Sequence, residues 1–438
     1  MAKNIFKNKK VLIMGLGLHG GGVAVAKFFY KQGADVLVTD LKTEAQLKDS
    51  IEKLKGLEVK YTLGGHKEAD FIWADLIMKN PDVASTSPYL EIARKNNIAI
   101  ETDVSLFFSL SKAFVIGVTG TKGKSTTASL IYHLLKPKYK RIFLAGNIGI
   151  SPLELLPKIK NTDTVVLELS SFELEDLKQS PNMAVITNIM PDHLNRYASM
   201  TEYVEAKKTI FKYQKKKDFL ILNEDDSIVR QFAKEANGKV YYFSWNKSPE
   251  KIDLSKFKLL GRNNTANLSA AIEVAKILKV SAKTIEKEIE SFKGVSSRQE
   301  FIEEIGGVKY FNDTTATIPE AVISAIDSLS EKFENAKIFL ICGGVYKGVE
   351  YKKMAEKIRE KNIEVILLPG NASDKIKESL LNYDKINEVS NMPEAVEKAS
   401  KLAKAGDLVI LSPAASSFNM FKNEFDRGEQ FVKAVKDL

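Results

Sequence analysis

Short apolar runs alternate with helix-like segments along the whole chain of 438 residues. The runs are only a few residues long and rich in Val, Ile and Leu, which is typical of strands buried on both faces of a parallel sheet. We therefore expect an α/β fold with mostly parallel sheets. A chain of this length exceeds one ordinary hydrophobic core, so it should divide into two or three domains.

The alternation falls into three blocks, which we expect to be domains: residues 1–101, 102–297 and 298–438. The third block opens with two strand-like runs around Gly306-Gly307, which predicts a β-hairpin. The expected helices include 264–278 and 282–292, and the expected strands are 11–14, 35–39, 113–118, 164–167, 184–187, 219–222, 300–304, 308–311, 337–341, 363–367 and 408–411.

A glycine- and lysine-rich turn follows the apolar run 113–118 and precedes a helical pattern from about residue 127. A strand, such a turn and a helix N-terminus together form a phosphate cradle, because backbone N–H groups and the helix dipole face the anion. Lys124 would reach the β- and γ-phosphates, and the Ser125 hydroxyl would bind Mg²⁺. The usual spacing would place a glycine at Val118, whereas the glycine here is Gly120. We expect bound nucleoside triphosphate, and the alternative is a solvated lysine-rich turn. The turn is Gly120-Thr121-Lys122-Gly123-Lys124-Ser125-Thr126.

A second glycine-rich turn lies near the N-terminus, directly after the strand expected at 11–14. It fits the dinucleotide pattern G-x-G-x-x-G, and Asp40 ends the next strand, where a ribose-binding acid would lie. Alone, the pattern predicts NAD, but the other nucleotide site weakens that interpretation because a dehydrogenase needs no P-loop. The same turn could hold the diphosphate of a nucleotide-linked substrate, or bind no ligand. Its residues are Gly15-Leu16-Gly17-Leu18-His19-Gly20.

Two candidate metal ligands follow strands of the central block. Glu168 comes at the end of the strand at 164–167, and His193 follows the strand at 184–187. Because ligands of open α/β sheets bind at the carboxyl ends of strands, both side chains would lie near the Gly120 turn and could hold Mg²⁺. The alternatives are a solvated glutamate at a strand end and a histidine with a structural role. Lys207 falls in a helical segment and, from the sequence alone, is a helix-surface lysine.

Composition excludes several other classes of protein. The net charge is +9, but only eight of the 65 basic residues are Arg and the lysines are spread among acids, so we expect no nucleic-acid partner. The longest apolar runs fall short of a membrane span, and residues 1–10 lack the apolar core of a secretory signal. The single cysteine, Cys342, cannot form an internal disulfide, which favours a cytoplasmic location.

Four motifs together resemble the Mur ligases, ATP-dependent amide-bond ligases of peptidoglycan precursor synthesis. The resemblance covers essentially the whole chain. It implies an N-terminal Rossmann-like UDP-binding domain, a central P-loop ATPase-like domain and a C-terminal Rossmann-like domain that binds the amino acid. Within the family the chain is most similar to the type that adds D-glutamate to UDP-N-acetylmuramoyl-L-alanine through an acyl phosphate. The motifs are Gly120–Thr126, Glu168-Leu169-Ser170-Ser171, Asp192-His193-Leu194 and Asn264-x-x-Asn267, and the ending 411–428 carries the finer likeness.

The resemblance implies ATP and two Mg²⁺ ions as cofactors. It also implies roles for individual residues. Lys207 falls on the position that is carbamylated in the family and would, as a carbamate, hold the second ion. The implied catalytic residues are Lys124, His193, Lys207 and Lys347. The implied metal ligands are Ser125, Glu168, His193 and Lys207. ATP would be bound by Gly120–Thr126, with Asn264 and Asn267 at the adenine, Asp313 at the ribose and Arg298 near the γ-phosphate. The UDP-linked substrate would be bound by Gly15, Leu16, Gly17, His19, Asp40, Asn147 and Ser170, and glutamate by Thr317, Lys347 and Ser417.

Four positions depart from the family pattern. Thr315 stands where many members of the D-glutamate type have Lys, and Asn263, Asp82 and His19 replace His, Gly and a small hydroxyl residue. A Mur-type ligase that adds another amino acid, such as L-alanine, is therefore the nearest alternative. A nucleotide-binding regulator or an oxidoreductase that uses the first glycine turn is a third. The expected partners are small-molecule substrates, with no nucleic acid and no membrane, and we expect a monomer.

Overall fold

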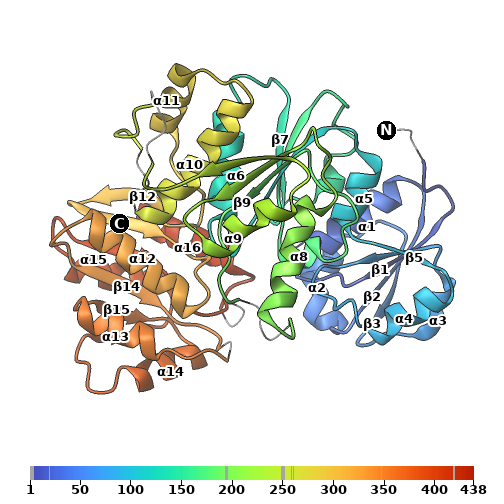
Figure 1. Ribbon diagram of the computed structural model, residues 1–438. Coiled ribbons are helices and arrows are strands. Elements are labelled where there is room, and N and C mark those ends of the chain that lie inside the picture. Colours follow the sequence, from blue (N-terminus) through green and yellow to red (C-terminus); the bar gives the residue numbers. More distant parts are fainter. Residues whose placement is uncertain are drawn as a thin grey trace. The chain divides into compact units, whose positions relative to one another are not determined.

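The computed structural model describes residues 4–18, 20–148, 150–192, 196–247, 252–257, 259, 261–346, 348–417 and 420–438. By their internal contacts, residues 1–257 and 262–291 form one compact unit, and residues 258–261 and 292–438 form a second. Figure 1 labels many of the elements and colours them along the chain. Each unit is an α/β structure, which confirms the fold class expected from the sequence.

The first unit begins with a five-stranded sheet in the order β3-β2-β1-β4-β5. All of its neighbouring strands run parallel. Each strand is followed by a helix, so the chain crosses back over the sheet after every strand. Because parallel strands align their carboxyl ends, the turn after β1 and the residue that ends β2 meet at one edge. The elements are β1 (Lys10–Met14), α1 (Gly21–Lys31), β2 (Asp35–Asp40), α2 (Glu44–Glu52), β3 (Val59–Leu63), α3 (Glu68–Trp73), β4 (Leu76–Lys79), α4 (Pro88–Lys95), β5 (Ala99–Glu101) and α5 (Asp103–Leu110).

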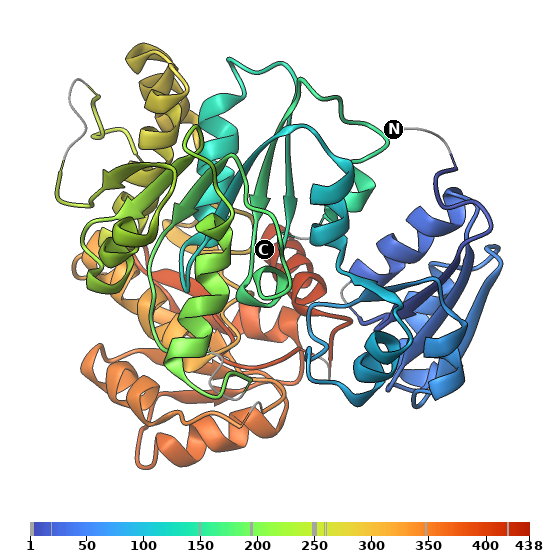
Figure 2. The ribbon, with the colours of Figure 1, turned by 45° about the vertical axis from the view of Figure 1, so that its right-hand side comes forward.

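The same unit contains a six-stranded parallel sheet in the order β11-β10-β9-β6-β8-β7. Helices α6 and α10 pack together against one face (Figure 2). On the other face Ile210 and Phe211 of α8 join a core with alternate strand residues such as Val165 and Leu167. The elements are β6 (Phe114–Thr119), α6 (Lys124–Leu135), β7 (Ile142–Gly146), the 3₁₀ turn Pro152–Glu154, β8 (Thr164–Glu168), α7 (Ser171–Leu174), β9 (Met183–Ile186), α8 (Met200–Lys212), β10 (Phe219–Asn223), α9 (Ser227–Gln231), the 3₁₀ turn Phe232–Glu235, β11 (Lys239–Phe243), α10 (Arg262–Ile277) and α11 (Ala282–Ser291).

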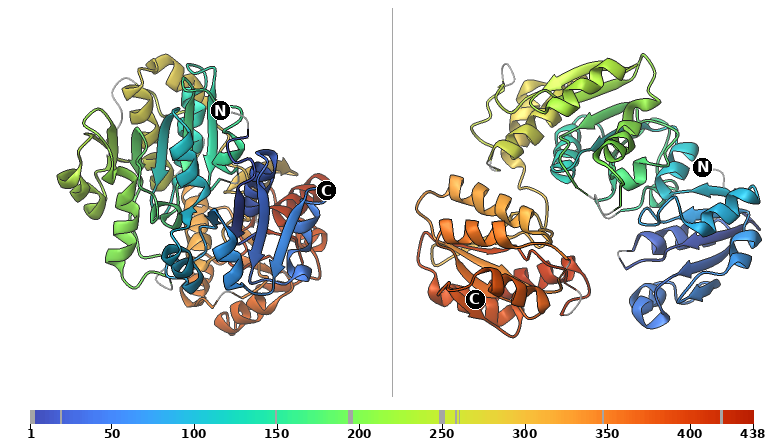
Figure 3. Two further views of the ribbon diagram at one scale, coloured as in Figure 1. Left: turned by 90° about the vertical axis from the view of Figure 1, so that its right-hand side faces the viewer. Right: turned by 60° about the horizontal axis from the view of Figure 1, so that its bottom comes forward.

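The second unit has its own six-stranded sheet, in the order β12-β13-β17-β14-β15-β16, drawn from orange to red in Figure 3. The β12–β13 pair is antiparallel, which confirms the expected hairpin, and the other neighbours are parallel. Separate apolar cores lie on the two faces of this sheet. The elements are β12 (Glu300–Ile305), β13 (Val308–Asn312), α12 (Pro319–Lys332), β14 (Ile338–Cys342), α13 (Lys352–Glu360), β15 (Glu364–Leu367), α14 (Asn371–Ser379), β16 (Ile386–Glu388), α15 (Met392–Leu402), β17 (Leu408–Leu411) and α16 (Glu424–Lys436).

Candidate functional site

In the turn between β6 and α6, the backbone of two glycines packs closely against neighbouring side chains. Gly120 has a φ of +148°, and a Cβ atom there would lie 1.9 Å from Oγ1 of Thr187. Gly123 has a φ of +83°, and its Cβ atom would lie 2.3 Å from Oδ1 of Asn267. Only glycine fits both places. Helix α6 begins at Lys124, earlier than the sequence pattern indicated, and no described side chain caps its N-terminus. The first backbone N–H groups of α6 therefore have no side-chain cap among the described residues and could bind an anion.

Two lysine ammonium groups converge on one carbonyl oxygen of this turn. Nζ of Lys124 donates to the carbonyl oxygens of Gly120 (3.2 Å) and Thr121 (3.0 Å), and Nζ of Lys207 donates to that of Gly120 (2.8 Å). Burial, and next the positive charge of Lys124, lower the pKa of Lys207 well below its ordinary value. The positive charge of Lys124 therefore lies beside the turn and favours the neutral form of the neighbouring Lys207 amine.

The interpretation of Lys207 as a helix-surface lysine is wrong. Its exposed fraction is 2%, and Nζ also lies 4.8 Å from the ring centre of Tyr203, whose hydroxyl contacts the Thr121 hydroxyl at 3.0 Å. The helical period contained this information, because Lys207 is four residues after Tyr203 and three before Ile210, both of which are buried. The length of the lysine side chain then carries Nζ from α8 to the turn.

Glu168 ends β8 at the same sheet edge and is buried, with an exposed fraction of 1%. Its Oε1 atom accepts from Nδ2 of Asn147 at 3.3 Å, whereas Oε2 has no hydrogen-bond partner among the described atoms. A buried, unpartnered carboxylate oxygen is rare in proteins and suits an additional cationic partner. The Oε2 atom of Glu168 is therefore available to a cation, as the sequence predicted for this residue.

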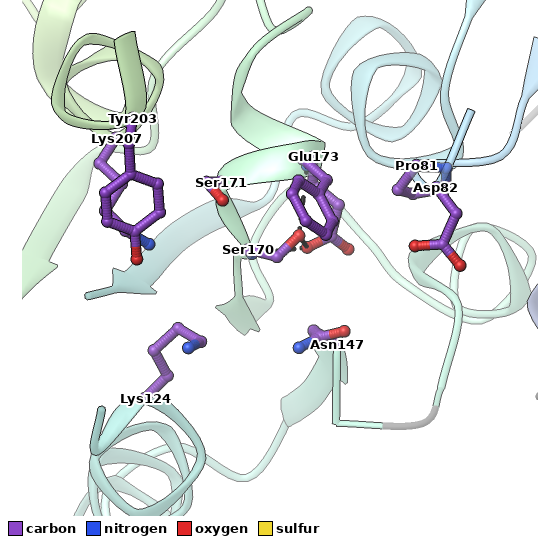
Figure 4. Close-up of a pocket in the computed structure, with 10 residues that line it drawn as sticks. Pro81, Asp82, Lys124, Asn147, Ser170, Ser171, Glu173, Tyr203 and Lys207 are labelled. Atoms are coloured by element: carbon purple, nitrogen blue, oxygen red, sulfur yellow. Dashed lines mark hydrogen bonds between the residues drawn. The ribbon is translucent and has the colours of Figure 1, made fainter. Parts of the chain in front are cut away.

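A cavity of about 270 Å³ lies beside these groups. Figure 4 shows Lys124 and Asn147 on one side of it and Ser170, Glu173, Tyr203 and Lys207 on the other. Pro81, Asp82, Ser171 and Phe172 complete the lining. The predicted residues Lys124, Asn147, Ser170 and Lys207 are thus brought together.

Glu173 is a cavity residue that the sequence did not single out. Its Oε2 atom accepts from the backbone N–H (2.6 Å) and the hydroxyl (2.7 Å) of Ser170, which caps α7. Burial, followed by the negative charge of Asp103, raises the pKa of Glu173 to about 8. At neutral pH this carboxyl group is therefore mostly protonated, and the cavity keeps its positive charge.

The residues implied for ATP are divided between the two units. In the first, Asn264 lies in the first turn of α10, and Oδ1 of Asn267 accepts from the Thr127 hydroxyl at 3.1 Å while packing against Gly123. Arg298 and Asp313 belong to the second unit. Burial raises the pKa of Asp313 to about 7, and its carboxylate accepts from the Ser412 hydroxyl and the Gln299 N–H.

Two residues implied for glutamate follow strands of the third sheet. Thr317 comes after β13 and Ser417 after β17, at the carboxyl edge. The Ser417 hydroxyl is buried and has no hydrogen-bond partner among the described atoms. Thr315, one of the positions that depart from the expected pattern, gives its hydroxyl hydrogen to the carbonyl oxygen of Ser297 at 3.0 Å.

At the N-terminal glycine turn, in contrast to the described surroundings of the Gly120 turn, a carboxylate already accepts hydrogen bonds from the backbone N–H groups. Oδ2 of Asp40 accepts from the N–H groups of Leu16 (2.9 Å) and Gly17 (3.1 Å), and Oδ1 accepts from Lys42 N–H (2.9 Å). A Cβ atom at Gly15 would lie 2.8 Å from Cβ of Asn80. The carboxylate expected to bind a ribose is therefore engaged in fixing the turn.

A partly buried ionic network, also missed from the sequence, joins residues 79–85 to the segment directly after α7. Nζ of Lys79 contacts Glu175 (3.4 Å) and Asp176, and Arg196 contacts Glu175 (2.6 Å) and the carbonyl oxygen of Asp82 (2.9 Å). Such pairing depends on residues distant in sequence, so no local signal predicts it. The network brings Pro81 and Asp82 to the cavity.

Three predicted site residues, His19, His193 and Lys347, lie outside the described residues. Among the residues that are described, no group of three or more His, Cys, Asp or Glu side chains is arranged to hold a metal ion. No helix in the described part of the chain is long and apolar enough to cross a membrane.

Comparison with known proteins gives one consistent result. The Mur ligase MurD-like N-terminal domain matches residues 9–102, the Mur ligase middle domain matches 118–275, and the glutamate ligase domain of Mur ligases matches 297–415. The UDP-N-acetylmuramoylalanine–D-glutamate ligase of Roseiflexus sp. (strain RS-1) is 38% identical over 98% of this chain and 99% of its own length. The ligase of the same name from Acetivibrio thermocellus is 37% identical over 100% of this chain and 98% of its own length.

Solved structures agree on the fold. The UDP-N-acetylmuramate–alanine ligase MurC of Thermotoga maritima, at 22% identity, superposes with a TM-score of 0.64 over 98% of this chain and all of its own. The MurF ligase of the same organism, solved in complex with ADP, is 19% identical with a TM-score of 0.59 over 99% and 96%. With family domains matched along its length and relatives this similar over nearly the entire chain, the protein belongs to the Mur ligase family.

Proposed function

We propose that the protein is an ATP-dependent ligase that joins D-glutamate to UDP-N-acetylmuramoyl-L-alanine, forming ADP and phosphate, in peptidoglycan precursor synthesis. The observation that carries this proposal is the cavity in which Lys124 and Lys207 face the Gly120 turn, next to a carboxylate oxygen of Glu168 without a partner. The choice of substrates is supported by relatives that are named for this reaction and are similar to this chain over nearly their full length.

ATP phosphates would bind at the turn formed by Gly120–Thr126. The N-terminus of α6 offers N–H groups, and Lys124 would exchange its two carbonyl contacts for phosphate oxygens. Asn264 and Asn267 would bind the adenine, and we propose Arg298 and Asp313 as further ATP-binding residues.

Mg²⁺ would be held by Ser125, Glu168, His193 and Lys207, the last as its carbamate, with two ions in total. Bound there, the ions would neutralise the negative charge that phosphoryl transfer develops. The unpartnered Oε2 atom of Glu168 supports this assignment. Carbamylation needs a neutral amine, whose nitrogen attacks the carbon of CO₂ and loses a proton. The lowered pKa of Lys207 favours that neutral form.

The reaction proceeds in two steps. A carboxylate oxygen of the UDP-linked substrate attacks the γ-phosphorus, the bond to the bridging oxygen breaks, and ADP leaves. The amine of glutamate then attacks the acyl carbon, loses a proton and expels phosphate. Both steps build negative charge, which Lys124 would stabilise.

The substrates would be held at the edges of the other two sheets. Gly15, Leu16, Gly17, His19 and Asp40 with Asn147 and Ser170 would position the UDP-sugar, and Thr317, Lys347 and Ser417 the glutamate, for which the unpartnered Ser417 hydroxyl is the supporting observation. We further propose three domains, residues 1–101, 102–297 and 298–438, in a cytoplasmic monomer.

A phosphate-release assay across amino acids tests the proposal. With ATP, Mg²⁺ and UDP-N-acetylmuramoyl-L-alanine, D-glutamate should give the highest kcat/KM, and omission of either substrate should stop phosphate release. Preference for L-alanine with UDP-N-acetylmuramate would instead establish the neighbouring ligase specificity. Tight NAD binding without ATP turnover would establish the third alternative.

A further inference from the structure

Arg427 is a buried arginine on α16, and within the described part of the chain its side chain donates three hydrogen bonds to the loops at the carboxyl edge of the third sheet. Its exposed fraction is 0%. Nε donates to the Thr314 hydroxyl at 3.0 Å, Nη2 to the Thr314 carbonyl oxygen at 2.8 Å and Nη1 to the Ala415 carbonyl oxygen at 3.1 Å. Burial lowers the pKa of Arg427 to about 10, so the guanidinium remains charged at neutral pH. A buried cation is costly unless its hydrogen bonds are satisfied, and here each of these bonds goes to a loop.

The two loops are neighbours because their strands are neighbours. Residues 313–317 follow β13 and residues 412–417 follow β17, and these strands pair in parallel. A direct bond, from the Ala414 N–H to the Ala316 carbonyl oxygen at 2.8 Å, also joins the loops. The planar fork of Arg427 adds contacts to both, which a lysine ammonium could not reproduce.

Helix α16 approaches the first loop closely at this point. A Cβ atom at Gly428 would lie 2.7 Å from Cγ2 of Thr314, so only glycine allows this spacing without movement. The Thr314 hydroxyl itself donates to the Glu424 carbonyl oxygen at 2.7 Å. The helix therefore both donates hydrogen bonds to the loop and accepts one from it, which fixes the position of the guanidinium.

The loops carry residues of the proposed amino-acid site. Thr317 ends the first and Ser417 ends the second, and the buried Ser417 hydroxyl has no partner among the described atoms. We propose that Arg427 is a positioning residue that fixes the spacing of these two loops, and thereby the Ser417 hydroxyl, for the incoming amino acid. This inference rests on the proposed function, because it assumes that the amino acid binds there.

The test is the Arg427→Lys variant of the full-length protein, assayed with the amino acid that the wild type uses best. We expect KM for the amino acid to rise about tenfold, since charged hydrogen bonds to both loops are lost, while KM for ATP changes less than about twofold. Thr314→Val removes the hydroxyl that accepts from Nε but keeps the arginine, and should raise the same KM about threefold.

Arg359→Lys is the matched control. Arg359 also donates to two backbone carbonyl oxygens, those of Ser379 and Leu381, within the same unit. These contacts are remote in sequence from both loops, so the control should leave KM for the amino acid unchanged.

The outcomes separate cleanly. The inference would be overturned if folded Arg427→Lys and Thr314→Val proteins had the wild-type KM for the amino acid. It would also be overturned if KM for ATP rose as much as KM for the amino acid. If Arg427→Lys does not fold, Thr314→Val alone decides. If the wild type prefers an amino acid other than D-glutamate, the proposed function fails, but the Arg427 test still applies with that amino acid.

Discussion

The two glycine-rich turns of the first unit have similar local structure and opposite electrostatic surroundings. Both follow a buried parallel strand, both have a glycine of positive φ immediately before a helix, and no described side chain caps either helix. At the first turn the Asp40 carboxylate already occupies the N–H groups of Leu16 and Gly17. At the second turn no described carboxylate occupies the N–H groups in this way, and the Nζ atoms of Lys124 and Lys207 both contact the carbonyl oxygen of Gly120. Glycine spacing therefore predicts the shape of a turn, and the surrounding charges decide whether it can take a phosphate.

The largest effect expected from this difference is at Lys124. Lys124→Met should reduce turnover by about a thousandfold, because it removes the cation that faces the transferred phosphate. Lys256→Met is the control: its exposed ammonium pairs with Glu290 at 2.9 Å and belongs to none of the proposed sites, so turnover should stay within about threefold. Steady-state phosphate release measures both. Equal activity of the two variants would mean that the second turn is no more a phosphate site than the first.

Lys207 tests whether the second turn needs a modified lysine. Lys207→Ala should lose about a hundredfold in turnover, and a short carboxylic acid such as acetate should restore part of it by replacing the carbamate. Lys208→Ala, next in sequence but paired on the surface with Glu205 and Glu235, should remain active. A stable Lys207→Ala protein that no acid rescues would contradict the carbamate.

Asp40 tests the opposite assignment for the first turn. Asp40→Asn leaves a neutral group to accept from Leu16 and Gly17, which should lower the free energy of unfolding by about 1–3 kcal/mol and raise KM for the UDP-linked substrate more than KM for ATP. Asp35→Asn breaks only an exposed pair with Lys60 and should cost less than about 1 kcal/mol. Denaturant titration compares them. Unchanged stability of Asp40→Asn would remove the distinction between the turns.

The last effect is on stability alone and concerns the charge of the cavity near the second turn. A carboxyl group with a raised pKa in the folded state stabilises the protein fully below its ordinary value of 4.5, and the contribution is lost as the pH rises towards about 8. Glu173→Gln, which needs no proton, should therefore gain stability relative to the wild type between pH 5 and pH 8.5, by roughly 2–4 kcal/mol. Thermal unfolding at the two pH values measures this, and a pH-independent difference would show that Glu173 is ionised at neutral pH.

Much of the fold could be predicted because each buried strand is an uninterrupted apolar run, as at Val165–Leu167. The sheet-edge rule also brought Glu168 and Lys124 together correctly, since both follow central strands of one parallel sheet. The helical period places Lys207 on the same face of α8 as the buried Tyr203 and Ile210, so its burial follows from the local pattern. Asp40, Glu175 and Arg427 depend on partners far away in sequence, and no local pattern encodes such pairs.

The central claim is that phosphate at the second turn is transferred to a substrate carboxylate and not to water. The most direct measurement uses UDP-N-acetylmuramoyl-L-alanine labelled with ¹⁸O in its carboxylate, together with ATP and D-glutamate, followed by mass analysis of the inorganic phosphate. The account predicts one ¹⁸O atom in each phosphate released, carried over when the acyl phosphate breaks. Phosphate without the label would contradict it.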